Sequence, residues 1–165
     1  MFRRIADFET AWQGEMHSTM KVLSRLTDQS LGQRVTPDGR SLGFLAWHIA
    51  GSIPEMMNRT GLTVAGPEPG TPPSSTAEIQ QGYERAARSL LDEVRSKWTD
   101  ASLEQEDDMY GEPWRRGFTL YALCLHEAHH RGQMTVLMRQ AGLAVPGVYG
   151  PAREEWAAMG LAAME

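Results

Sequence analysis

The sequence predicts an all-α fold, most simply an antiparallel four-helix bundle with long connections. Four long segments carry apolar residues at steps of three and four, which is the spacing of a helix with one buried face. No alternating strand pattern of useful length competes with these segments, and there is no internal repeat. The 165 residues, 41% of them hydrophobic, are expected to form one domain, residues 1–165, with a full core.

The first predicted helix covers roughly the first thirty residues, and Gly32 is expected to end it. After a turn-rich stretch, Ser41 is placed to cap a second helix, which has Gly61 beyond its end. Pro54 is expected to kink this second helix. The apolar faces of the two helices consist of Ile5, Phe8, Trp12, Met16, Met20, Leu23 and Leu26, and of Leu42, Leu45, Ile49, Ile53 and Met56 or Met57.

Two long connections surround the third predicted helix. Residues 61–75 are dense in Gly and Pro, which favour neither helix nor strand, so they are expected to cross the surface. Ser75 and Glu78 have the spacing of a capping box at the head of the third helix, and residues 99–117 form the next connection. The apolar stripe of this helix consists of Ile79, Tyr83, Ala86, Leu90, Val94 and Trp98.

The fourth helix is predicted over residues 118–141, with Gly142 as its stop. Leu120, Leu123 and Leu137 belong to its apolar stripe. Beyond it, Pro151 is placed at the first position of a short C-terminal helix around Trp156.

The charge balance argues against nucleic acid as a partner. The chain has 21 acidic and 16 basic residues and a net charge of −5, so it lacks the basic footprint that binds phosphate backbones. Because it also lacks a membrane-spanning apolar run and a signal peptide, we expect a cytoplasmic protein without membrane contact. The single Cys124 cannot form an internal disulfide, which agrees with a reducing compartment.

Histidines in the fourth predicted helix suggest a metal site. His126 and His130 are four residues apart, so a helix places both rings on the face that points into the bundle. His129 lies about 60° round from His126 and is a poorer partner. A third ligand must come from another helix, and His48 is the other histidine within an apolar helical stretch; His17 is the weaker candidate.

A site of His48, His126 and His130 would suit a divalent transition metal such as Zn²⁺, Ni²⁺, Fe²⁺ or Co²⁺ better than Mg²⁺ or Ca²⁺, which prefer oxygen ligands. Three protein ligands leave a position for water or substrate, as in catalytic sites, whereas structural zinc is normally closed by four. A single buried histidine is more often a hydrogen-bonded core residue than a ligand. The pair with i, i+4 spacing is what favours the metal site.

A second interpretation is a metal-dependent hydrolase of the zincin type. Residues 126–130 also satisfy the H-E-x-x-H pattern, with Glu127 as the general base and Glu154 as a third ligand. Against this interpretation, Glu127 points about 100° away from His126 on a helix. A peptidase also usually binds its substrate along a strand edge, which the predicted helical fold lacks.

Three segments resemble the DinB, or YfiT-like, superfamily of damage-inducible proteins. They are Leu45–Ala50 around His48, the HExxHRGQ-like segment His126–Gln133, and the tail Val145–Trp156. The order of the helices agrees as well, so the resemblance covers essentially the whole chain.

The resemblance implies a small four-helix bundle that runs up-down-down-up, with the crossover in the long second connection. It also implies that His48, His126 and His130 bind one divalent metal. Members of the superfamily include transferases and isomerases that use low-molecular-weight thiols such as bacillithiol or mycothiol, so a metal-dependent thiol S-transferase is the leading function. The alternative is a stress-response protein that binds a metal or a small molecule without turnover.

Several other side chains are candidates for the surroundings of the metal. Arg131 is placed to bind an anionic cofactor group, although a solvent-exposed position on the helix surface is the favoured interpretation. Gln133 could orient a ligand histidine, and Glu55, on the same face as His48, could accept a proton. The remaining candidates are His129 beside the site and Trp47, Trp114 and Tyr110 as pocket walls. Cys124 is unsuited as a ligand because it lies about 160° away from His126.

The expected partners are a small-molecule substrate or a thiol cofactor. A homodimer is expected from the family pattern and from outward-lying apolar residues of the first and fourth helices. If the chemistry is thiol chemistry, the thiol is expected to arrive on a cofactor.

Overall fold

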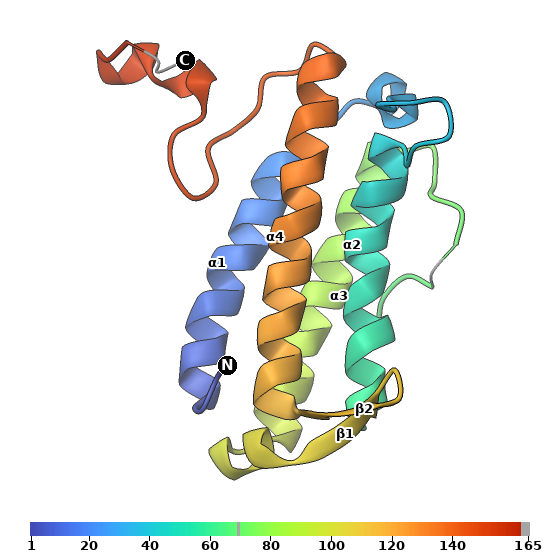
Figure 1. Ribbon diagram of the computed structural model, residues 1–165, viewed down its shortest axis with the longest axis vertical. Helices are drawn as coiled ribbons and strands as arrows, with labels where there is room; N and C mark the ends of the chain where they lie inside the picture. The colour runs from blue at the N-terminus through green and yellow to red at the C-terminus, as the bar shows by residue number, and fades with distance from the viewer. Residues whose placement is uncertain (69, 163–165) are drawn as a thin grey trace.

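The computed structural model describes residues 1–68 and 70–162. In this part of the chain, four α-helices form a bundle: α1 (Ile5–Leu23), α2 (Leu42–Met57), α3 (Thr76–Lys97) and α4 (Arg116–Gln140). Figure 1 shows α1 and α4 running upward and α2 and α3 running downward. Both α1 and α2 pack against α3 and α4. The all-α class and the up-down-down-up order with its crossover are therefore confirmed.

α1 is shorter than its apolar pattern predicts. The α-helix ends at Leu23, and the chain then forms a 3₁₀ turn, η1 (Asp28–Gly32). Thr27 starts this turn by exchanging hydrogen bonds with Ser30, whose backbone N–H donates to the Thr27 hydroxyl over 3.3 Å. Hydroxyl side chains compete with helical hydrogen bonding in this way. The apolar pattern continues past the helix because Leu26 stays buried in the turn.

The predicted caps of α2 and α3 are present. The hydroxyl of Ser41 accepts the N–H of Phe44 over 3.1 Å, and that of Ser75 accepts the N–H of Glu78 over 3.4 Å. Each bond satisfies one of the N–H groups that a helix start leaves without a partner. α2 runs through Pro54 to Met57 and is followed by a 3₁₀ turn, η2 (Asn58–Thr60), which ends at Gly61 with a φ of 80°.

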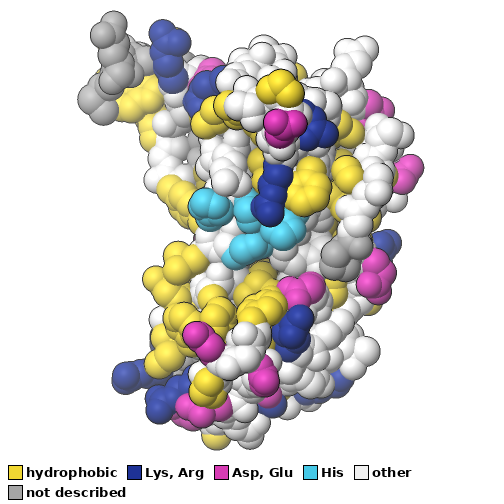
Figure 2. Space-filling view, turned by 45° about the vertical axis from the view of Figure 1, so that its right-hand side comes forward, with side chains coloured by type: hydrophobic (Ala, Val, Ile, Leu, Met, Phe, Trp, Pro, Cys, Tyr) yellow, Lys and Arg dark blue, Asp and Glu magenta, His cyan; other side chains and the backbone are white. Residues whose placement is uncertain are grey.

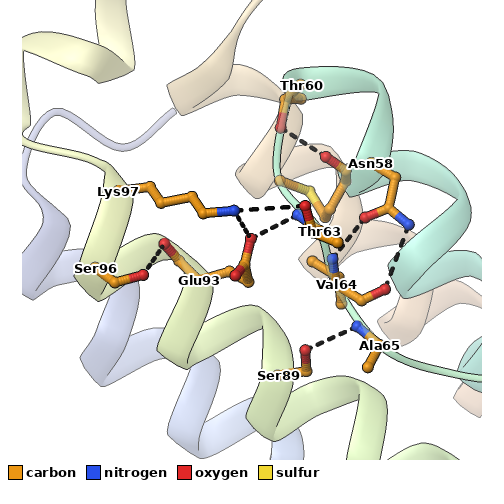
Figure 3. A network of polar contacts seen from close by, with 10 residues as sticks. Asn58, Thr60, Thr63, Val64, Ala65, Ser89, Glu93, Ser96 and Lys97 are labelled. Atoms are coloured by element: carbon orange, nitrogen blue, oxygen red, sulfur yellow. Dashed lines mark hydrogen bonds and ion pairs between the residues drawn. The ribbon is translucent and has the colours of Figure 1, made fainter.

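The crossover from α2 to α3 is attached to the side of α3 (Figure 3). The carboxylate of Glu93 accepts the backbone N–H of Thr63 over 2.5 Å, and the hydroxyl of Ser89 accepts that of Ala65 over 2.8 Å. Further along, Gly66 passes so close to α3 that a Cβ on it would lie 2.8 Å from the Cβ of Ala86. The crossover is therefore held by specific contacts.

Removing the charge of Glu93 should loosen the start of the crossover. Hydrogen bonds from Lys97 and from the Thr63 N–H lower the pKa of Glu93 below its ordinary value of 4.5. Its stabilising contribution is therefore present above pH 4.5 and is lost as the pH falls through the lowered pKa. We expect Glu93→Gln to reduce the free energy of unfolding by roughly 0.5–1 kcal/mol at pH 7, and less in acid, as measured by urea denaturation.

Glu84→Gln is the matched control for this measurement, because the Glu84 carboxylate pairs on the surface of α3 with Arg88 and with no other side chain of residues 1–68 and 70–162. An equal loss in both variants, or a difference that does not depend on pH, would contradict the assigned role of Glu93.

The connection between α3 and α4 contains an antiparallel hairpin that the sequence analysis did not predict. Its strands are β1 (Glu106–Met109) and β2 (Glu112–Arg115), preceded by a 3₁₀ turn, η3 (Asp100–Glu104). Tyr110 and Gly111 form the turn with φ values of 62° and 88°, the backbone that two-residue hairpin loops require. The strands have four residues each and are rich in acidic side chains, so they show no apolar alternation.

The short C-terminal helix consists of two 3₁₀ turns, η4 (Arg153–Glu155) and η5 (Ala157–Met159). The carboxylate of Glu155 accepts the N–H groups of Gly147 and Ala152 over 3.0 and 3.1 Å, which closes the first turn on the preceding loop. Among the described residues, none of the helices has the length and apolar character needed to cross a bilayer.

Candidate metal centre

The three histidines expected to form a site lie together between α2 and α4. Ring nitrogens of His48, His126 and His130 all lie within 4.8 Å of one another. The ring centroid of His48 is 5.0 Å from that of His126 and 4.7 Å from that of His130. Figure 2 shows His side chains gathered in a hollow of the surface, with hydrophobic side chains above and below. The group could hold a metal ion.

The geometry of the α4 pair fits a metal ion. The Nε2 atoms of His126 and His130 are 3.1 Å apart, close to the ~3.3 Å expected between two nitrogens bound to a tetrahedral ion at ~2.0–2.1 Å. His130 Nδ1 donates to Gln133 Oε1 over 2.7 Å, since an amide oxygen only accepts. This bond places the lone pair of His130 on Nε2, where it faces His126. Gln133 therefore orients the ring of His130, as a partner of the outer coordination shell would if His130 bound a metal.

The three rings are poised to be neutral, which is the form that binds metals. Burial, together with the neighbouring rings of His130 and His48, lowers the pKa of His126 to about 4. Burial also lowers the pKa of His48, with added lowering from His130 and from the Arg40 guanidinium. The pKa of His130 is lowered mainly by burial, against a raising effect of the bond to Gln133. At neutral pH the three imidazoles are therefore uncharged, and each has a ring nitrogen with a lone pair that can bind a metal.

A cavity of about 620 Å³ adjoins His48. One wall is the face of α2 that carries Phe44 and Trp47, and the other is the crossover, with Thr71 and Pro72. Phe44 stacks on the ring of His48 at a centroid distance of 5.8 Å. Trp47 therefore lines the cavity. The crossover wall could not be assigned from sequence because residues 61–75 carry no periodic pattern.

The indole of Trp47 fits against α3 because the residue of α3 that faces it is a glycine, Gly82. A Cβ on Gly82 would lie 2.8 Å from Cζ3 of the indole. Any side chain at this position would push the ring into the cavity.

Glu55 lines the same cavity but is already engaged. Its carboxylate accepts the hydroxyl of Tyr110 over 2.7 Å and pairs with Arg59 over 3.0 Å. Burial and this bond raise the pKa of Tyr110 to about 12. Tyr110 thus reaches the cavity wall through Glu55, whereas Trp114 packs against the ring of Phe118 at 5.0 Å.

Arg131 lies neither beside the histidines, where it would bind an anionic group, nor on the solvent-exposed surface of α4. It is 2% exposed and points to the side of α4 opposite the histidines. Its guanidinium donates to the Thr19 hydroxyl over 2.8 Å and pairs with Glu15 and Glu127. The surface position favoured from sequence is therefore wrong, because the partners of Arg131 come from α1, more than a hundred residues earlier.

Glu127 belongs to the same buried cluster, and this contradicts the zincin interpretation. Its carboxylate is fully buried and accepts the hydroxyls of Thr19 and Tyr83 over 2.9 and 3.0 Å. Burial raises its pKa to about 7. A carboxylate held between α1 and α3 cannot act as a base beside His126. Glu154, the third ligand of that scheme, instead pairs with Arg139 on the surface over 3.2 Å.

The remaining candidates lie outside the three-histidine group. His129 is exposed, although its ring centroid is 4.9 Å from that of His130. His17 is exposed on α1. Cys124 is buried, and burial raises the pKa of its thiol to about 12, so it stays protonated.

Known proteins share both the sequence and the fold. The DinB family model matches residues 1–163. YrdA, an uncharacterised protein of Bacillus subtilis, is 42% identical over 99% of this chain and 98% of its own length. The crystal structure of a DinB-like protein of Bacillus cereus matches with a TM-score of 0.88 and 43% identity, over 90% of this chain and 100% of that chain.

A second solved structure, the DinB-like protein YjoA of Bacillus subtilis, shares the fold with a TM-score of 0.69. It is 16% identical and covers 88% of this chain and 99% of its own. With a family match along almost its whole length, the chain belongs to the DinB family.

Proposed function

We propose that the protein is a divalent-metal-dependent enzyme that transfers a small thiol to an electrophile. The observation that carries this proposal is the convergence of three neutral imidazoles beside a cavity of about 620 Å³. Such a donor set suits Zn²⁺, Ni²⁺ or Fe²⁺, and three protein ligands would leave room for a further ligand on the ion. The thiol is supported by the thiol-dependent members of the superfamily that the chain resembles.

A metal bound to His48, His126 and His130 would supply Lewis-acid activation, which lowers the pKa of a coordinated thiol. The chain's own residues prepare the site for this chemistry. Gln133 keeps His130 in the tautomer that presents Nε2. Phe44 and Trp47 give the cavity an apolar wall, which excludes water from a reactive sulfur.

A screen of thiols against a chromogenic electrophile tests the proposal. We expect the metal-loaded protein to accelerate transfer from at least one of bacillithiol, mycothiol, glutathione and coenzyme A, and we expect a chelator to abolish the acceleration. His129→Ala should keep the activity, because His129 lies outside the three-histidine group.

Absence of both turnover and thiol binding with the metal-loaded protein would overturn the proposal. That result would favour the non-catalytic alternative, in which the bundle binds a metal or small molecule. The hydrolase alternative has lost its general base, since Glu127 is buried on the far side of α4.

The homodimer stays a prediction. Leu125 and Val136, which are 50% and 52% exposed on α4, are apolar side chains that such an interface would cover.

A further inference from the structure

A second cavity, of about 390 Å³, adjoins the one beside the histidines. The two cavities share three lining residues, Phe44, Thr71 and Pro72. The second is otherwise lined by the loop before α2, residues 34 and 38–41. A ligand can therefore extend from the histidines, past the ring of Phe44, to this loop.

The loop presents a cation that has no partner of its own. The guanidinium of Arg40 lies over the ring of Phe44, 5.1 Å from its centroid, and its side chain forms no ion pair or hydrogen bond within residues 1–68 and 70–162. Arg34, in contrast, donates to the carbonyl of Gly39. Asp38 is the one acid among the lining residues of this cavity, so the two arginines leave it with a net positive charge.

Arg40 is also close enough to the histidines to act on them. Its charge contributes, after burial and the neighbouring histidines, to the lowered pKa of His48. Figure 2 shows a Lys or Arg side chain lying against the histidine cluster. The cation–π contact with Phe44 uses none of the guanidinium N–H groups for an ion pair or hydrogen bond within the described residues, so they are available to a planar anion.

At the opposite end of the cavity, the ion pair of Glu55 with Arg59 carries no net positive charge. Along α2, His48 follows Phe44 by one turn, about 6 Å, and Glu55 lies about 16 Å from Phe44. Because Glu55 is paired with Arg59 there, that end offers an anion less attraction than Arg40, which forms no ion pair within the described residues. An anionic ligand would therefore be oriented with its charge toward Arg40.

We propose that Arg40 binds an anionic group of the ligand, so that the molecule taken by this site is a small organic acid whose metal-binding head is separated from a carboxylate or phosphate by an apolar spacer. The spacer lies along Phe44 and Pro72. The identity of the head as a thiol rests on the proposed function, whereas the anion site rests on Arg40 and the two cavities.

Matched thiols test this site by isothermal titration calorimetry on the nickel-loaded protein. The probes are 3-mercaptopropionate and 6-mercaptohexanoate, each compared with the alcohol of the same length. Of the two carboxylates, the one with the higher affinity should bind about tenfold more tightly than the alcohol of the same length. A tenfold ratio is what one charge-assisted hydrogen bond contributes. Arg40→Gln should reduce this ratio to about one, while Arg40→Lys should keep part of it.

Arg88→Gln is the control, because Arg88 is an exposed arginine of α3 that pairs with Glu84. A carboxylate preference that survives in Arg40→Gln, or no preference in the wild type, would overturn the anion site. A six-carbon thiol that carries a phosphate monoester in place of the carboxylate is titrated in the same way. The comparison of the two affinities shows which anion the site prefers.

A probe without sulfur separates this inference from the proposed function. Hexanoate and 1-hexanol are compared by saturation-transfer NMR on the same variants. If no thiol binds but hexanoate binds in a manner that depends on Arg40, thiol chemistry is wrong and the anion site stands. If thiols bind without regard to the carboxylate, the anion site is wrong and the proposed function stands.

Discussion

Replacing His126 with alanine is expected to reduce bound transition metal from about one ion per chain to background. Its Nε2 lies 3.1 Å from that of His130, and two remaining imidazoles hold a divalent ion far less tightly than three. The measurement is elemental analysis of protein purified without a metal-affinity tag. Loss of the metal should also remove the stabilisation that any ligand of the folded state provides, which a thermal melt with and without chelator detects.

His129→Ala and His17→Ala are the matched controls, because both histidines are exposed and lie outside the group of three. They should retain the metal. Circular dichroism establishes that the His126 variant is folded. Unchanged metal content in that folded variant would remove the proposed site.

The second large effect is expected at the buried cluster on the other side of α4. Arg131→Met should lower the free energy of unfolding by about 3–5 kcal/mol, because it removes the buried cation shared by Glu15 and Glu127 and forces Glu127 to take up a proton or stay unpaired. Urea denaturation measures this loss. The double variant Glu127→Gln with Arg131→Met should recover part of it, since it removes the fully buried carboxylate together with its cation and leaves only the partly exposed Glu15 without its partner.

Arg139→Met provides the comparison, because Arg139, which is also on α4, forms an exposed pair with Glu154 of η4, and such pairs contribute at most about 1 kcal/mol. Metal content of the Arg131 variant should equal that of the wild type. A destabilisation no larger than that of Arg139→Met would show that the cluster is unimportant for stability, and a loss of metal would show that it supports the histidines.

The parts of the molecule that sequence could predict are those determined by local spacing. His126 and His130 face the same side because they are one turn apart, and Ser41 and Ser75 cap helices through bonds to residues three positions away. Joining His48 to this pair required only that a second apolar helix pack on the first.

The positions of Glu127 and Arg131 could not be predicted in the same way. An amphipathic helix is expected to bury one face, but α4 packs against both α1 and α2 and therefore buries two polar faces. Of the groups that hold Arg131 in the interior, Glu15 and Thr19 of α1 and Tyr149 of the tail are distant from it in sequence. The hairpin was missed for a different reason, since its short acidic strands are specified by the Tyr110–Gly111 turn rather than by an apolar pattern.

One wall of the cavity belongs to α2 and the other to the crossover. The segment that carries histidines and the segment that forms the opposite wall can therefore change independently during evolution. Helices α2 and α4 carry the histidines, whereas Thr71 and Pro72 come from a loop outside the bundle core. A change in loop length has little effect on stability, because each doubling of the length adds only about 0.6 kcal/mol to the entropic cost of closing the loop. The crossover wall of the cavity can therefore change in length or sequence without altering the helices that hold the three histidines together.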